Sequence, residues 1–106
     1  VDELLQRFEM QWTTIINRFN TSLEADRVVC ATMADWEYRQ ASLNWNLPLV
    51  ATFTDDELKA VAVHELVHVL TAPIWESIPT GRTRDNLFRL NELATENVSR
   101  VLLALL

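Results

Sequence analysis

Glycine, proline and cysteine are scarce in this chain of 106 residues, which has one glycine, three prolines and one cysteine. Such a composition has no room for a low-complexity linker, and the length fits a single domain over residues 1–106. Cys30 has no second cysteine to pair with, so an intrachain disulfide is excluded. A reducing, cytoplasmic compartment is therefore expected. No apolar run approaches the ~18 residues of a membrane-spanning helix.

Positive charge is also in short supply. The chain has 9 Lys and Arg against 15 Asp and Glu, which gives a net charge of −6. A nucleic-acid-binding surface needs a basic patch, and an anionic membrane attracts runs of Lys and Arg. Neither pattern occurs, so nucleic acid and membrane are not expected partners. Hydrophobic residues make up 49 % of the chain, which is enough for a packed core.

The chain does contain the pentapeptide His64-Glu65-Leu66-Val67-His68, which has the pattern H-E-x-x-H and holds both histidines of the chain. Residues four apart lie on one face of a helix, so His64 and His68 can bind one metal ion. Glu65 follows the first histidine, where its carboxylate can reach a water molecule on that ion and act as general base. The alternative interpretation is two core-lining histidines that flank a glutamate.

The pattern before this motif predicts one helix and one hairpin. Apolar residues recur at the helical period over residues 2–19, which indicates a helix that serves as scaffold. Residues 27–34 and 37–47 read as two antiparallel strands, and the connection between them is at Asp35-Trp36. The second strand alternates between a core-facing (dry) side and a solvent-facing (wet) side. The dry side holds Ala41, Leu43, Trp45 and Leu47, and the wet side holds Gln40, Ser42, Asn44 and Asn46. An open strand edge near a cleft could pair with an extended peptide, although a plain solvated face explains the same alternation.

Two helices are predicted in the second half of the chain. The first begins at the capping box formed by Thr54 and Glu57, covers residues 55–70 and ends at Thr71-Ala72-Pro73. A connection over residues 74–82 follows, with Trp75 against the core, and the last helix covers residues 84–105. The predicted buried stripe of the last helix is Leu87, Leu90, Ala94, Val98, Val101 and Leu105, and a stripe roughly opposite holds Glu92, Glu96 and Ser99.

A catalytic zinc site needs a third protein ligand besides two histidines. A carboxylate on the following helix is the usual partner, which points to Glu92 or Glu96. Cys30 would serve only if its strand faced the site. On periodicity alone both glutamates could equally belong to a solvated helix face.

At this point the sequence resembles the gluzincin metallopeptidases, in which a Glu on the helix after H-E-x-x-H completes the zinc site. The segment Asn91-Glu92-Leu93-Ala94-Thr95-Glu96 is similar to the N-E-x-x-S-D segment of thermolysin-like members. The resemblance implies Glu92 as the zinc ligand and Glu96 as a supporting acceptor for His64 or His68. A second register, starting at Glu96, places Arg100 where the family has an acid. The metzincin pattern is absent, because Thr71 and Ile74 stand where its Gly and third His belong.

The order of elements is also similar to that of small phage-encoded metallopeptidases, which adds a phage or virion association as an expectation. The expected fold is α+β: a minimal zincin-like domain with an N-terminal helix, an antiparallel hairpin, the H-E-x-x-H helix and a Glu-bearing C-terminal helix. Unlike the larger peptidases, the chain has no second subdomain and no third histidine for the oxyanion. Tyr38 and the arginines are the only candidates for that role.

The interpretation is a zinc-dependent metallopeptidase that hydrolyses peptide bonds of a peptide or protein substrate, with Zn²⁺ on His64, His68 and Glu92 and with Glu65 as general base. The alternative is a catalytically silent zincin-fold protein that binds metal or serves in assembly. A helical interaction domain without metal is the third interpretation. Glu65 separates the first two, because a structural zinc ion needs ligands but no general base.

Overall fold

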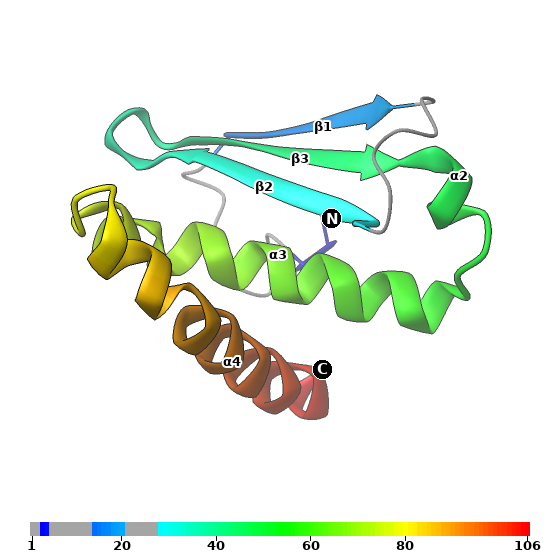
Figure 1. The fold of residues 1–106 in the computed structure, drawn as a ribbon. Coiled ribbons are helices and arrows are strands. Elements are labelled where there is room, and N and C mark those ends of the chain that lie inside the picture. The colour runs from blue at the N-terminus through cyan, green and yellow to red at the C-terminus, as the bar shows by residue number, and fades with distance from the viewer. Residues whose placement is uncertain (1–2, 5–13, 21–27) are drawn as a thin grey trace.

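The computed structural model describes residues 3–4, 14–20 and 28–106. Within them a three-stranded sheet lies against one long helix, and a second long helix packs on the first (Figure 1). The strands β1 (Thr14–Asn20), β2 (Cys30–Asp35) and β3 (Gln40–Asn46) lie in the order β1-β3-β2. The helices are α2 (Leu47–Val50), α3 (Asp55–Glu76) and α4 (Arg82–Leu105). The predicted α+β class is confirmed. None of the described helices is long and apolar enough to cross a membrane.

The predicted hairpin is confirmed. Strands β2 and β3 pair antiparallel, with Cys30 opposite Trp45 and Asp35 opposite Gln40. The connection is longer than Asp35-Trp36, because the short 3-10 helix η2 (Trp36–Tyr38) and Arg39 complete the reversal. Arg39 has φ 55°, the left-handed conformation that lets a chain close a tight turn.

The predicted N-terminal helix is wrong over residues 14–19, which belong to strand β1. This strand pairs parallel with β3, from Thr14 opposite Gln40 to Asn20 opposite Asn46. Ile15 and Ile16 are β-branched and fit a strand, although their spacing from Phe19 also fits a helix. The segment forms a strand and not a helix because it pairs with β3, which is distant in the sequence. Residues 3–4 of the predicted helix are helical, and residues 2 and 5–13 lie outside the described residues.

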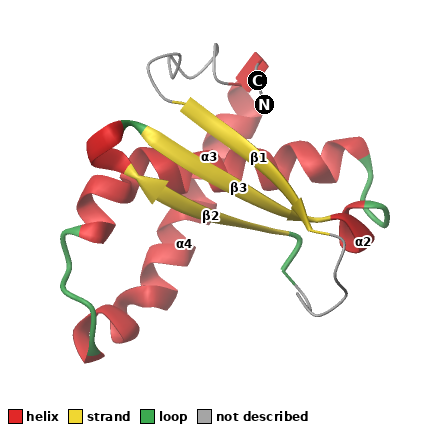
Figure 2. Ribbon diagram, turned by 90° about the horizontal axis from the view of Figure 1, so that it is seen from above, coloured by secondary structure: helices red, strands yellow, loops and turns green. Residues whose placement is uncertain are grey.

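The core lies between the sheet and α3, which Figure 1 and Figure 2 show on one face of the sheet. The predicted dry face of β3 is confirmed at Ala41, Leu43 and Trp45, which are buried, and is wrong at Leu47, which is exposed at the start of α2. The residues of the predicted wet face are exposed or half-buried, except Asn46, which is 4 % exposed. Asn46 ends the strand and is the N-cap of α2, so the alternation stops there.

Helix α3 begins where the sequence predicts and ends later. Thr54 Oγ1 accepts a hydrogen bond from the Glu57 backbone N–H at 3.2 Å, and Glu57 Oε1 accepts one from the Thr54 N–H at 2.9 Å. The helix was expected to end at residue 70, but it continues through Pro73 to Glu76. Pro73 lies in the last turn, where a missing N–H and a clash with the preceding turn disturb little of the helix that follows. Trp75 therefore belongs to α3 and not to a connection.

The faces of α4 are the reverse of the prediction. Leu90, Val98, Val101 and Leu105 of the predicted buried stripe are exposed, as is Ala94, and Leu87 is half-buried. The opposite stripe of Glu92, Glu96 and Ser99 faces α3 instead, and Thr95 is buried together with Ser99. Their hydroxyls donate to the carbonyl oxygens of Asn91 at 2.8 Å and Thr95 at 2.7 Å, so their burial leaves no unpaired donor.

Candidate metal centre

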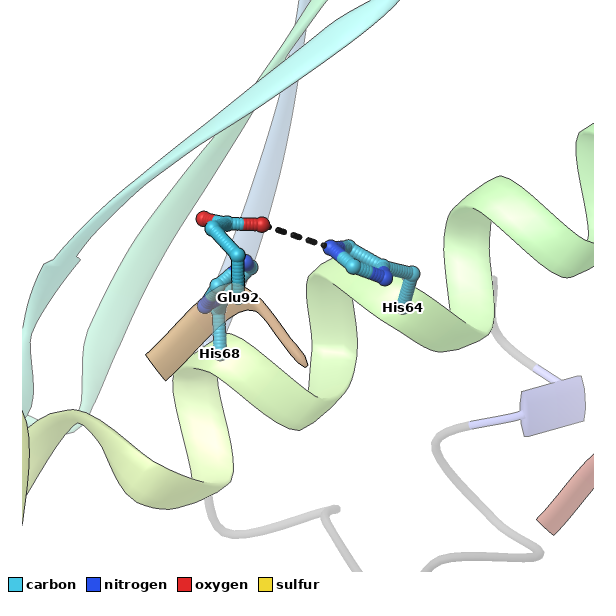
Figure 3. A group of neighbouring side chains, drawn as sticks. All are labelled: His64, His68 and Glu92. Atoms are coloured by element: carbon cyan, nitrogen blue, oxygen red, sulfur yellow. Dashed lines mark hydrogen bonds and ion pairs between the residues drawn. The ribbon is translucent and has the colours of Figure 1, made fainter. Parts of the chain in front are cut away.

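Three side chains from α3 and α4 meet where the two helices face each other (Figure 3). His64 and His68 project from consecutive turns of α3, and their ring centroids are 4.9 Å apart. Glu92 comes from α4 and its carboxylate spans both rings: Oε2 lies 3.2 Å from Nε2 of His64, and Oε1 lies 3.2 Å from Nε2 of His68. The two histidines therefore face carboxylates and do not line the apolar core.

The donor set of His64, His68 and Glu92 fits a transition-metal ion. One nitrogen from each imidazole and one carboxylate oxygen all lie within 4.8 Å of one another. Three atoms at that spacing share a centre no more than about 2.8 Å from each, against about 2.0–2.2 Å for zinc bound to nitrogen or oxygen. Rotamer adjustments of less than ~1 Å therefore bring the three donors to bonding distance. Two nitrogens and one oxygen are also the donors of many catalytic zinc sites.

Glu96 contacts His64 on the ring nitrogen that faces away from Glu92. Its Oε2 lies 2.9 Å from Nδ1 of His64. A carboxylate at this position accepts the Nδ1–H and leaves the Nε2 lone pair free for a metal. Arg100 donates from Nε to the other carboxylate oxygen at 3.0 Å. Partial burial raises the pKa of the Glu96 carboxyl, but the hydrogen bonds and charges of Arg100 and His64 outweigh it and hold the pKa below its usual range.

Glu65 lies beside the three donors and not among them. It is 8 % exposed, and its carboxylate accepts a hydrogen bond from the Thr32 hydroxyl of strand β2. Burial raises the pKa of Glu65 above its usual range, and the charge of Glu92 adds to this rise. The Thr32 hydrogen bond and the charges of His68 and His64 oppose it without cancelling it. A buried carboxyl with a raised pKa, close to three side chains that could hold a metal ion, is suited to exchanging a proton with a neighbouring group.

A cleft of about 610 Å³ passes over these residues. Glu65, His68 and Glu92 form part of its wall. Strand β2 forms another part through Cys30, Ala31, Thr32 and Ala34, and Val28 before the strand adds to it. Within the described part of the chain β2 pairs only with β3, so its second edge is unpaired there. The cleft is therefore lined by a strand that has one unpaired edge.

Cys30 lies on the wall of the same cleft but is a poor candidate for the third ligand. Burial, followed by the charge of Glu65, raises the pKa of the Cys30 thiol to about 12. Metals bind the thiolate, which this environment disfavours. Of the two glutamates that the sequence left open, Glu92 contacts both histidines and Glu96 contacts only His64.

Sequence reasoning missed three residues of this region. Thr32 carried no signal, because its strand was predicted without knowing which face or edge lay over the motif. Trp75 and Phe88 line the cleft, but Trp75 was expected in a loop and Phe88 was not singled out. Of the described candidates for stabilising an oxyanion, the cleft wall includes Arg84 and does not include Tyr38, which is 72 % exposed on η2.

Comparison of the chain with protein-family models, with curated proteins and with solved structures finds no match. The chemistry of the site rests on its own residues: two imidazoles and a carboxylate whose donor atoms lie close enough to share one ion, and a buried carboxyl beside them.

Proposed function

We propose that the protein is a zinc-dependent metallopeptidase. The observation that supports this most directly is the meeting of His64, His68 and Glu92, whose donor atoms lie within 4.8 Å of one another, beside the buried carboxyl of Glu65. Two histidines and a glutamate hold a zinc ion with one position left for water. When bound, the ion makes water a stronger nucleophile and polarises the carbonyl group that the water attacks.

Glu65 is the proposed general base. It takes a proton from the attacking water and later delivers a proton to the amine that leaves as the peptide bond breaks. The Thr32 hydroxyl holds the carboxylate in one orientation through its hydrogen bond. Glu96 holds the ring of His64 through Nδ1, so that Nε2 points toward Glu92.

The open edge of β2 is the proposed docking site for the substrate backbone. An extended peptide can add to a free strand edge through main-chain hydrogen bonds, which accept any sequence. Thr32 lies on this strand and contacts Glu65, so a peptide paired with β2 passes directly over the base. The proposed substrate is therefore an extended segment of a peptide or of an unfolded protein.

The experiment compares the wild type with Glu65→Gln and with Asp56→Asn, a control that also removes one carboxylate from an exposed position on α3. Each zinc-loaded protein is incubated with a peptide mixture, and products are identified by mass. We expect Glu65→Gln to keep one zinc ion and to lose hydrolysis by about 10²–10⁴-fold. Asp56→Asn should cleave at the wild-type rate.

Two results contradict the proposal. If the zinc-loaded wild type cleaves no peptide, the protein is not a peptidase under these conditions and the catalytically silent metal-binding or assembly role takes its place. If Glu65→Gln cleaves as fast as the wild type, Glu65 is not the base. Absence of bound zinc in the wild type would remove both metal-dependent roles.

A further inference from the structure

The cleft continues past the metal-binding side chains to an aromatic end formed by Trp75 and Phe88. Their ring centroids are 6.4 Å apart with an interplanar angle of 58°. Both residues line the same cavity as Glu65, His68 and Glu92. Phe88 is nevertheless 57 % exposed, so the described residues leave much of its ring uncovered beside the cleft. Exposed aromatic surface that continues from a site is typical of a ligand contact.

The spacing along both helices fixes how far this end lies from the metal site. Trp75 follows His68 by seven residues, or roughly 10 Å along α3, and Phe88 precedes Glu92 by four, or roughly 6 Å along α4. Both intervals run toward the connection between the helices, where Arg84 pairs with Glu76 at 3.0 Å. An extended peptide rises ~3.3 Å per residue. The aromatic end therefore lies about two or three substrate residues from the bond at the metal site.

Charge at this end is balanced. Arg84 donates to the Glu76 carboxylate, and its guanidinium carbon lies 5.1 Å from the centre of the Trp75 ring. The cation is thus occupied by a carboxylate and an aromatic face, and it holds the indole in place. A charged substrate side chain would have to compete with this pair. A large uncharged side chain would instead cover the exposed ring of Phe88 and gain from burial.

We infer that Trp75 and Phe88 form a specificity subsite for an aromatic or large aliphatic side chain of the polypeptide substrate, two or three residues from the cleaved bond. This assignment deepens the peptidase function proposed above and rests on it. The open edge of β2 binds any backbone, whereas this subsite selects which bond is presented to Glu65. The protein then cleaves at a fixed distance from a bulky apolar residue.

The experiment uses peptides of equal length made of Ala, Ser and Gly, in which one Phe is moved by one position at a time. The zinc-loaded wild type is compared with Phe88→Ala and with the control Leu90→Ala. Leu90 lies two residues away on α4 and is similarly exposed, at 60 %, but does not line the cleft. We expect the wild type to move its cleavage site in step with the Phe. In Phe88→Ala the cleavage site should no longer follow the Phe, and kcat/KM for Phe peptides should fall on the order of ten-fold. In Leu90→Ala both the cleavage position and kcat/KM should stay as in the wild type.

A binding measurement separates failure of the subsite from failure of the peptidase. Calorimetry with Glu65→Gln, alone and combined with Phe88→Ala, compares the Phe peptides with the parent peptide that lacks Phe. Binding that depends on Phe and on Phe88 supports the subsite even if the wild type cleaves nothing. Cleavage without register to Phe, or equal effects of Phe88→Ala and Leu90→Ala, overturns the subsite and leaves the peptidase standing. Absence of both cleavage and Phe-dependent binding overturns both.

Discussion

Nδ1 of His64 lies 2.9 Å from a carboxylate oxygen of Glu96, while Nε2 of the same ring lies 3.2 Å from Glu92. The two ring nitrogens therefore meet two different carboxylates. If Nδ1 donates to Glu96, only Nε2 has a lone pair for a metal, and it is the nitrogen that faces Glu92. In the proposed metal site this arrangement suits Glu92 to the ligand role and Glu96 to the supporting one.

The first prediction compares these two glutamates. Glu92→Gln should lower zinc affinity more than Glu96→Gln, because Glu92 approaches both histidines and Glu96 only one. Loss of a supporting carboxylate typically costs ~10–100-fold in affinity, and loss of a ligand should exceed that. Zinc titrations against a competing chelator measure both variants. A larger loss in Glu96→Gln would transfer the ligand role to Glu96.

Removal of the metal should lower the stability of the fold. The ion would join α3 to α4, which otherwise contact through packing and through the His–Glu contacts. A ligand that binds only the native state adds roughly 3 kcal/mol at a hundredfold excess over its Kd. This corresponds to a melting temperature higher by on the order of 10 °C for a domain of this size.

Thermal unfolding with zinc and with chelator checks this prediction, with Glu92→Gln as control. The variant should show a smaller difference between the two conditions than the wild type. Superimposable curves for the wild type, with zinc binding verified in one sample, would contradict the link between metal and stability.

Local patterns of the sequence correctly predicted the elements that depend on near neighbours. The capping box at Thr54 and Glu57 and the hairpin around Asp35 each arise within a few residues. The spacing of His64 and His68 needs only a helix to bring them together. Strand β1 could not be predicted in this way, since its pairing with β3 joins Thr14 to Gln40 and its apolar spacing also fits a helix.

The orientation of α4 escaped prediction for a different reason. Apolar periodicity selected Leu90, Val101 and Leu105 for the core, yet these residues are exposed. Thr95 and Ser99 are small and satisfy their own hydroxyls within the helix, so they can be buried against α3 at little cost. The polar stripe also carries Glu92 and Glu96, whose partners are the histidines of α3. The sequence singled out the two glutamates of α4 that lie against the histidines, although it placed the core on the wrong side of the helix.

The capping box makes a third prediction, on pH. The backbone hydrogen bond from Thr54, and then the Thr54 side chain, lower the pKa of Glu57 in the folded protein. The folded state therefore binds this proton less readily than the unfolded state, so the contribution of Glu57 is present above its ordinary pKa and is lost as the pH falls through the lowered pKa.

Chemical denaturation over the acidic range measures this contribution. Glu57→Gln should flatten the acid-side fall in unfolding free energy relative to the wild type. Thr54→Ala should remove about 1 kcal/mol at neutral pH, the usual cost of losing an N-cap side chain. Asp56→Asn, which changes a neighbouring carboxylate, serves as the control. A profile for Glu57→Gln that parallels the wild type throughout would show that the box carries no pH-dependent stability.

The last prediction concerns Thr32, which the sequence did not single out. Its hydroxyl donates to the buried carboxylate of Glu65, and this contact joins strand β2 to the H-E-x-x-H helix. Thr32→Val keeps the shape of the side chain but leaves a buried carboxylate without this donor, which should cost about 1–3 kcal/mol of stability. Thr32→Ser retains the hydroxyl and should lose much less. Because the hydrogen bonds of the Thr32 hydroxyl go to Glu65 and not to the three proposed metal ligands, zinc affinity should change little in either variant. Under the proposed function, kcat should fall in Thr32→Val and recover in Thr32→Ser, because the hydroxyl orients the base and the methyl group does not.

Denaturation, zinc titration and peptide cleavage on the two variants test each part separately. Equal behaviour of Val and Ser at this position would mean that packing against β2, and not the hydrogen bond, holds Glu65 in place.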